Sequence, residues 1–249
     1  MADRFYLPEL PRAETATLTG DEAHHLGRVR RLASGARVEL FDGRGGWCRA
    51  EVVQVGKHAV ELKLDEFATE PTPPFALTLA TAVPKGERFD WLVEKATELG
   101  VARLVPLVTE RSVVDPRTAK LDRLRRLIVE ACKQCGRSRL MALDEPTPLG
   151  RYLATERAER RWLAHPGQGA FRTEEWTSCA VAVGPEGGFT PREVDEALAA
   201  GWRTASLGTT LLRIETAGIA AAAVVLADGW AANRQGPTSH VQTPPDLSS

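Results

Sequence analysis

Hydrophobic and polar positions follow two different periods along the chain, and the change falls near residue 70. Before that point, apolar residues alternate with polar ones at Val38, Leu40, Val60, Leu62 and Leu64. A period of two is typical of strands with one buried face. Residues 1–70 therefore predict a small, mainly β unit. One short helix is expected at 21–32, with Gly20 and Asp21 as candidates for its N-cap.

A proline-rich segment separates this unit from the rest of the chain. Residues 68–75 read ATEPTPPF, with prolines at positions 71, 73 and 74. Prolines so closely spaced stiffen the chain and exclude helix, so we interpret the segment as an interdomain linker.

After the linker, apolar strand patterns alternate with helical ones. Strands are expected at 76–83, 102–108, 160–165, 179–184 and 203–208, and helices at 88–99, 120–135, 191–200 and 215–233. This alternation predicts an α/β domain over residues 75–232, with a parallel sheet covered by helices on both faces. Residues 233–249 are polar and rich in proline, which predicts a disordered tail.

A glycine-rich turn, GPEGG at 184–188, joins one of these strands to a well-specified helix. Thr190 at the N-cap, Pro191 at the first position and Glu193 at the third form a capping box. Gly201 stands where the helix would end. The inward face of the helix is expected to be Val194, Ala197 and Leu198.

The turn is not a phosphate loop. No lysine follows it, and Glu186 would repel a phosphate, so it matches neither nucleotide-binding pattern. A second unusual loop, SLGTTLLRIETAG at 206–218, also follows a strand. Ligands of open α/β sheets bind at the carboxyl ends of strands, so the two loops could form one pocket for a phosphate-free ligand. A plain β-to-α turn is the structural alternative for 184–188.

Composition favours a soluble protein. The chain has 249 residues, 43% apolar, and a net charge of −1. The longest apolar run, at 217–227, is too short to span a membrane, and the N-terminal residues do not resemble a signal peptide. We therefore expect a cytoplasmic protein with no membrane partner.

Four cysteines do not make a disulfide framework in a chain of this length. Cys132 and Cys135 form a C-x-x-C pair, but zinc would need two further ligands, and Cys48 and Cys179 are isolated. We expect no metal, and interpret the pair as buried thiols on a helix.

Several segments of the sequence resemble those of a known family. VGPEGGFTPREVDEA and LGTTLLRIETA are similar to the two cofactor motifs of the 16S rRNA uracil N3-methyltransferases, of the SPOUT superfamily. HHLGRVRRLASGARVELFDGRGG, PKGERFDWLVEKATELGV, LVTERSVV and EACKQCGRSR resemble further segments of that family. The similarity covers roughly residues 4–228, and the matching segments follow one another in the same order.

The resemblance implies a SPOUT-type sheet with a deep C-terminal trefoil knot, an N-terminal PUA-like β-barrel domain and a homodimer. It also implies S-adenosylmethionine as the methyl donor. The implied cofactor-binding residues are Ala164, His165, Gly184, Pro185, Glu186, Gly187, Gly188, Leu207, Gly208, Leu211, Leu212, Arg213, Thr216 and Ala217. One departure is that Thr209 and Thr210 stand where the family has Pro-Arg.

The predicted chemistry is displacement of a methyl group from a sulfonium by uracil N3. Arg213 is the candidate for stabilising the anion that develops on the uracil. Glu215 is a candidate base, although a carboxylate favoured by the dipole of a helix N-terminus is the alternative. His165 is a further candidate base, because the reference pKa of a histidine side chain, about 6.5, suits proton transfer.

Basic residues indicate an RNA partner, expected to be 16S rRNA within the small ribosomal subunit. The candidate contacts are Arg28, Arg30, Arg31, Lys85, Arg88, Arg111 and Arg137. Arg123, Arg126 and Lys133 share a helical face with Arg137 by their spacing. Such a face binds RNA backbone, but an ordinary solvated helix face has the same pattern.

Other functions remain open from the sequence. One is a SPOUT methyltransferase with another target, such as tRNA or 23S rRNA. Another is a non-catalytic ribosome-assembly protein that binds RNA. A nucleotide-dependent enzyme is disfavoured by the absence of a phosphate-loop lysine.

Overall fold

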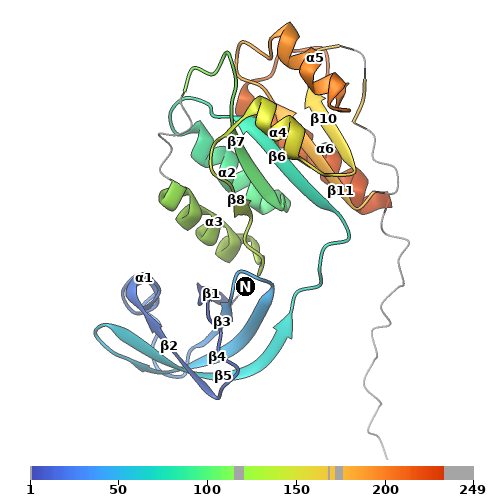
Figure 1. The fold of residues 1–249 in the computed structure, drawn as a ribbon. Helices are drawn as coiled ribbons and strands as arrows, with labels where there is room; N and C mark the ends of the chain where they lie inside the picture. The colour runs from blue at the N-terminus through green and yellow to red at the C-terminus, as the bar shows by residue number, and fades with distance from the viewer. Residues whose placement is uncertain (1, 115–120, 168, 172–175, 233–249) are drawn as a thin grey trace, which may run out of the picture.

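The computed structural model describes residues 2–114, 121–167, 169–171 and 176–232. The predicted tail at 233–249 lies outside these residues. The chain forms a smaller β part and a larger layered part, and the segment between β5 and β6 connects them (Figure 1).

The smaller part is a single curled sheet. Its strands are β1 (Asp3–Tyr6), β2 (Thr15–Thr19), β3 (Arg37–Phe41), β4 (Gly46–Val55) and β5 (Ala59–Thr69), in the order β1-β3-β4-β5-β2. The β1–β3 pair is parallel, and the other pairs are antiparallel. The predicted alternation is confirmed, because Val38, Leu40, Val60, Leu62 and Leu64 are all buried in one core.

The helix of this part is short, and its N-cap lies one residue before the first predicted candidate. It comprises α1 (Gly20–His24) and a π-helical turn (His25–Val29), and its N-cap is Thr19. Gly20 and Asp21 were therefore wrong as cap candidates. Asp21 lies in the first turn instead, where the helix dipole favours a carboxylate.

The larger part is built on a parallel sheet. Its strands are β6 (Ala76–Ala82), β7 (Arg103–Val108), β8 (Ala142–Leu143), β9 (Thr147–Pro148), β10 (Arg160–Ala164), β11 (Ser178–Val183) and β12 (Arg203–Ala205). The order is β12-β10-β11-β6-β7-β8, and β9 also pairs with β7. The SPOUT-type α/β class is confirmed, whereas the trefoil knot stays a prediction.

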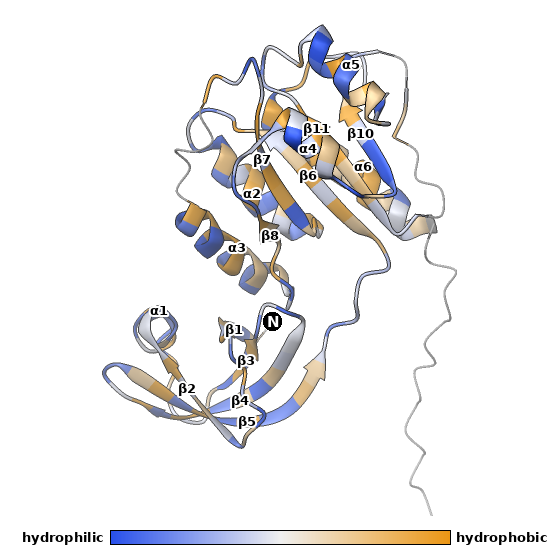
Figure 2. Cartoon of the chain, in the orientation of Figure 1, coloured by the Kyte–Doolittle hydropathy of each residue, from blue (hydrophilic) through white to orange (hydrophobic). Residues whose placement is uncertain are grey.

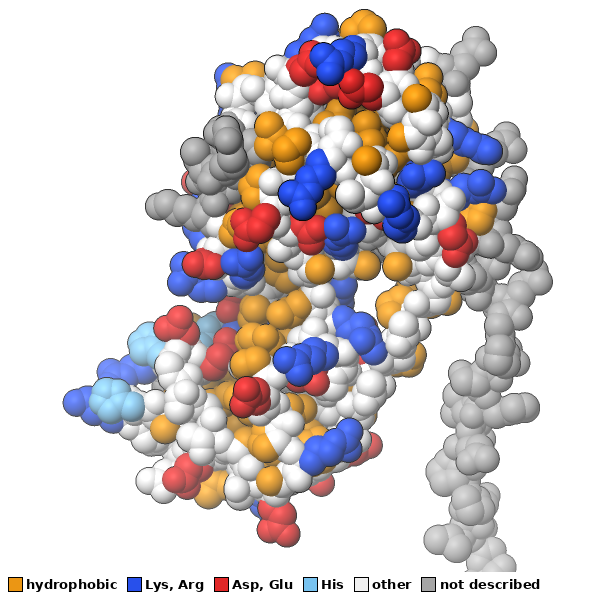
Figure 3. Space-filling model, viewed as in Figure 1, with side chains coloured by type: hydrophobic (Ala, Val, Ile, Leu, Met, Phe, Trp, Pro, Cys, Tyr) orange, Lys and Arg blue, Asp and Glu red, His pale blue; other side chains and the backbone are white. Residues whose placement is uncertain are grey.

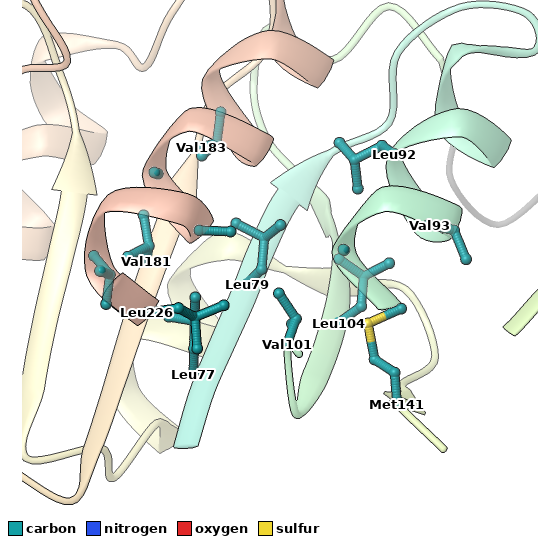
Figure 4. Close-up of a cluster of buried hydrophobic side chains, with 14 of the residues drawn as sticks. Leu77, Leu79, Leu92, Val93, Val101, Leu104, Met141, Val181, Val183 and Leu226 are labelled. Atoms are coloured by element: carbon teal, nitrogen blue, oxygen red, sulfur yellow. The ribbon is translucent and has the colours of Figure 1, made fainter. Parts of the chain in front are cut away.

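Helices cover both faces of this sheet, as the sequence predicted. One face packs against α2 (Arg88–Leu99), α3 (Leu121–Cys135) and α6 (Ile214–Ala232). In Figure 4, Leu77 and Leu79 of β6 lie between side chains of α2 and α6, among them Leu92 and Leu226. Ala80 of β6 and Val105 of β7 point to the other face of the sheet, where they belong to a second core.

The opposite core contains α4 (Leu149–Thr155) and α5 (Pro191–Ala199). Its largest side chain is Trp202, which packs against Tyr152 with ring centroids 5.6 Å apart and ring planes tilted by 55°. The Trp202 indole N–H donates to the carbonyl of Leu153 at 3.3 Å, so the one polar atom of this side chain is satisfied.

The predicted capping box of α5 is present, but its inward face differs from the prediction. Ala197 is buried, whereas Leu198 is 49% exposed and Glu193 is buried in its place. The Glu193 carboxylate turns inward because it accepts backbone hydrogen bonds there. Ala197 lies one turn later on the same face, and Leu198 is rotated about 100° away from it.

Arginines join the two parts of the molecule. Arg4 of β1 donates to the carbonyl of Arg137 at 2.9 Å and to the Ser138 hydroxyl at 2.7 Å. Arg139 donates to the carbonyl of Arg44, at 2.6 Å, and to that of Glu70. These contacts attach the smaller sheet to the segment that follows α3.

The basic face predicted for α3 is only partly exposed. Figure 2 shows hydrophobic and hydrophilic residues alternating along this helix, and Arg123 and Arg126 are exposed on it. However, Lys133 pairs with Glu22 of the smaller part at 2.5 Å, and its side chain is only 9% exposed. Arg137 lies beyond the helix, and its guanidinium donates to the carbonyls of Thr97 and Val101.

Helix α6 extends beyond both ends of the apolar run at 217–227. By length and composition alone, Ile214–Ala231 could cross a membrane, which the shorter run at 217–227 did not suggest. Half of this span is buried inside the protein, where it packs against α2, β6 and β11. A core helix passes the same test.

Candidate functional site

Two loops meet at the carboxyl edge of the parallel sheet. Residues 184–190 follow β11, and residues 206–213 follow β12. Both strands pair with β10, which lies between them. The loops and the end of β10 surround a pocket of about 470 Å³, a size typical of small-molecule sites. The prediction that the two loops form one pocket is confirmed.

Most of the predicted cofactor-binding residues line this pocket. They are Ala164, His165, Gly184, Pro185, Glu186, Gly187, Gly188, Leu207, Gly208, Leu211, Leu212 and Ala217. Arg213 and Thr216 are exposed and are not part of the lining. Thr209 and Thr210, which stand where the resembling family has Pro-Arg, do line it.

Glycine is required at two points of the pocket wall. Gly188 has φ +66° and donates to the carbonyl of Pro185 at 2.8 Å, which closes a tight turn. Gly208 has φ +138°, and its carbonyl accepts from the Ser206 hydroxyl at 2.9 Å. L side chains strongly disfavour both conformations, so the sequence specifies these loop shapes through its glycines.

A buried carboxylate fastens the loop after β7 to the pocket wall. Glu193 accepts from the backbone N–H of Thr190 at 2.8 Å and from that of Glu110 at 2.9 Å. Next to Glu110, Arg111 donates to the carbonyl of Gly187 at 2.7 Å. The segment at 109–112 is therefore held against the glycine turn.

Arg111 is the main residue of the pocket lining whose place the sequence did not indicate. The sequence predicted an RNA contact at this position, and the structure places the side chain in the pocket lining. A lone arginine after a strand carries no signal for such a contact. Its partner Gly187 lies 76 residues away, and only the strand order brings the two together.

The charges of the pocket fit a phosphate-free ligand with mixed charge. Among the described lining residues, Glu186, Arg111 and His165 have side chains that can carry charge, and none is a lysine. His165 Nδ1 lies 2.7 Å from the carbonyl of Pro166. Because a carbonyl only accepts, Nδ1 carries the hydrogen, and Nε2 is the proton acceptor of the neutral ring.

The two predicted catalytic residues lie beside the pocket, at the start of α6. Arg213 is exposed and directly precedes Ile214, a lining residue. Glu215 is buried, and one carboxylate oxygen lies 3.9 Å from the Arg88 guanidinium. Its other oxygen has no hydrogen-bond partner among the described residues. A carboxylate in the first turn of α6 is also favoured by the helix dipole, so its role as base stays a prediction.

Predicted RNA contacts occur on both parts of the molecule. Arg28, Arg30 and Arg31 are exposed after α1, and Lys85 and Arg88 are exposed at the start of α2. Lys85, Arg88 and the half-exposed Trp91 border a shallow hollow of about 560 Å³. Figure 3 shows Lys and Arg side chains around the junction of the two parts, with acidic residues among them.

In the C-x-x-C pair, Cys132 is a buried thiol as predicted, whereas Cys135 is only partly buried. Burial raises the pKa of Cys132 and of Cys179 to about 12, so both stay protonated at neutral pH. Cysteines 48, 132, 135 and 179 are all unpaired. Within the described part of the chain, no group of His, Cys, Asp and Glu is arranged to hold a metal.

Comparisons with known families match both parts of the chain. Residues 71–226 match the model of an RNA methyltransferase domain, and residues 18–65 match that of an RNA methyltransferase PUA domain. The larger match contains both pocket loops.

Relatives and solved structures agree with this assignment. A ribosomal RNA small subunit methyltransferase E from Synechocystis is 33% identical, over 84% of this chain and 72% of that protein. The one from Mycobacterium bovis is 31% identical, over 92% of this chain and 94% of that protein.

Among solved structures, a methyltransferase from Legionella pneumophila with bound SAM is 30% identical. The two structures superpose with a TM-score of 0.83, and the match covers 91% of this chain and 98% of that one. A ribosomal RNA small subunit methyltransferase E from Neisseria gonorrhoeae, bound to S-adenosyl methionine, has a TM-score of 0.81 at 29% identity, over 90% and 96%. The fold, the pocket and these matches agree, and the chain belongs to the family of RNA methyltransferases that includes the ribosomal RNA small subunit methyltransferases E.

Proposed function

We propose that this protein transfers a methyl group from S-adenosylmethionine to N3 of a uridine in 16S rRNA of the small ribosomal subunit. The observation that carries the proposal is the pocket formed by residues 184–190 and 206–213. The family of the chain and the methyl donor bound to two similar structures support the donor. The N3 position rests on the resemblance of both loops to the uracil N3-methyltransferases.

The residues of the pocket fit this donor. Its size suits a molecule of this class, and backbone groups of the glycine turn can contact adenine and ribose. Glu186 and the absence of lysine from the described lining suit a sulfonium better than a phosphate. When bound, S-adenosylmethionine supplies an electrophilic methyl group.

The residues of the chain would position uracil and manage its proton. The N3 proton must leave as the methyl group arrives, and negative charge then develops on O2 and O4 of the uracil. Arg213, exposed beside the pocket, would stabilise that charge. Of the two candidate bases, His165 lines the pocket and Glu215 does not, so this geometry supports His165 better.

The test is methylation of defined RNA by the purified protein. Small subunits from a strain that lacks the enzyme are incubated with the protein and labelled S-adenosylmethionine. We expect N3-methyluridine on mass spectrometry of the nucleosides, and one new stop in primer extension on 16S rRNA, because the methyl group blocks base pairing. Label in tRNA or 23S rRNA, or on a ribose hydroxyl, would contradict the proposal. RNA binding without methyl transfer would favour a ribosome-assembly role.

We further propose that the protein works in the cytoplasm as a homodimer. Leu211 beside the pocket is 90% exposed, and Val224 and Trp230 of α6 are each 47% exposed. Apolar side chains at the surface are used in interfaces with other chains. Light scattering after size exclusion should give a mass near two chains, and Leu211→Asp should lower it. A monomer at micromolar concentration would refute the dimer.

A further inference from the structure

We infer that Arg111 binds the carboxylate of the methyl donor's amino-acid group. This inference rests on the proposed use of S-adenosylmethionine. It gives Arg111 a role that differs from the RNA contact predicted from the sequence.

The Arg111 side chain lies in the pocket wall, against the glycine turn. Arg111 is part of the pocket lining, and its Nη1 donates to the carbonyl of Gly187 at 2.7 Å. Its Cδ lies only 3.3 Å from where a Cβ on Gly187 would be, so the arginine stem packs directly on the glycine turn. The hydrogen bond to Gly187 uses one of the five N–H groups of the guanidinium. The other N–H groups can donate to a carboxylate.

Hydrogen bonds fix the backbone on both sides of Arg111. The N–H of Glu110 donates to the buried Glu193 carboxylate at 2.9 Å. One residue earlier, the N–H of Thr109 donates to the Ser112 hydroxyl at 3.0 Å. A side chain on such a segment is already placed at the pocket, which lowers the entropic cost of binding a small ligand. By contrast, the candidate RNA contacts Arg28, Arg30 and Lys85 are not part of the pocket lining.

The charges of the donor and of the pocket lining are complementary at Arg111. The donor carries a carboxylate together with two cationic groups, an ammonium and a sulfonium. Among the described residues of the pocket lining, Arg111 is the one arginine and Glu186 is the one residue with a carboxylate side chain. A carboxylate near Glu186 would be repelled, whereas an arginine fork matches a carboxylate with two hydrogen bonds. The carboxylate therefore belongs at Arg111.

The experiment compares two ligands that differ only in this carboxylate. Calorimetry measures binding of S-adenosylmethionine and of decarboxylated S-adenosylmethionine to the wild-type protein and to Arg111→Gln. Glutamine keeps a donor for the Gly187 carbonyl but loses the charge. We expect Arg111→Gln to weaken S-adenosylmethionine about 10- to 100-fold and the decarboxylated ligand less than about two-fold. Arg111→Lys should recover part of the loss.

Arg192→Gln is the matched control. It removes the same charge from an exposed residue of the neighbouring helix, where Arg192 pairs with Glu196, and it should change neither affinity. An equal loss for both ligands would overturn the inference, because Arg111 would then only hold the glycine turn. Unchanged binding of both ligands with weaker 16S rRNA binding would also overturn it, in favour of an RNA contact. If the wild-type protein bound neither ligand, the proposed function would fail as well.

Discussion

An Arg213→Ala variant is expected to slow methyl transfer by about 100- to 1,000-fold while it changes the affinity for S-adenosylmethionine by less than about three-fold. The reason is the position of this residue. Arg213 is exposed at the start of α6, beside the lining residues Leu212 and Ile214, but is not itself part of the pocket lining. It can thus reach a uracil presented at the pocket without holding the donor. An interaction made mainly in the transition state lowers the rate and leaves ground-state binding intact.

Single-turnover kinetics with labelled donor, together with calorimetry, separate these two effects. Arg203→Ala serves as the control, since Arg203 is an exposed arginine at the start of β12, the last strand before the second loop. It should retain the wild-type rate. A full methylation rate in Arg213→Ala would refute the assignment. A parallel loss of donor affinity would instead support the cofactor contact that the family resemblance implied for Arg213.

The sequence predicts local structure best where one residue type has a clear physical role. The alternation in β5, the capping box of α5 and the glycines at 188 and 208 each act within a few residues, and the structure has all of them. By contrast, β8 and β9 are two residues each, too short for a period of two to be visible. These two strands form because their backbones pair with β7.

Long-range contacts explain what the sequence did not predict. Helical spacing placed Lys133 on a basic face, but the pairing with Glu22 depends on how the smaller part docks against α3. In the same way, Leu198 fits an amphipathic helix, yet Glu193 takes the buried position because Glu110 lies next to it. Both departures involve charged groups whose partners are distant in the chain, and no periodicity in the sequence encodes such pairs.

A Glu193→Ala variant is expected to lower the free energy of unfolding by about 3 kcal/mol and to weaken donor binding as well. The substitution leaves the backbone N–H groups of Thr190 and Glu110 without their acceptor. Each donor left unsatisfied in a buried setting costs about 1–3 kcal/mol, partly recovered where water can enter. The lost capping box contributes to the same figure.

Urea denaturation measures the loss of stability, and an unchanged slope against urea would show that the denatured state is not altered. Glu193→Gln should lie between the wild type and the alanine variant, because one amide oxygen can still accept. Glu196→Ala is the matched control on the same helix. Glu196 forms a surface pair with Arg192 at 2.9 Å, and such pairs contribute about 0.5 kcal/mol or less.

The donor affinity distinguishes a general loss of stability from a local one. Glu193 connects the segment that carries Arg111 with the N-terminus of α5 and the glycine turn before it. If this connection shapes the pocket, Glu193→Ala should weaken S-adenosylmethionine well below the unfolding temperature, when the protein is still folded. An unchanged affinity in a folded but less stable variant would mean that the pocket keeps its shape without the buried carboxylate, and that the Arg111–Gly187 contact alone positions the loop.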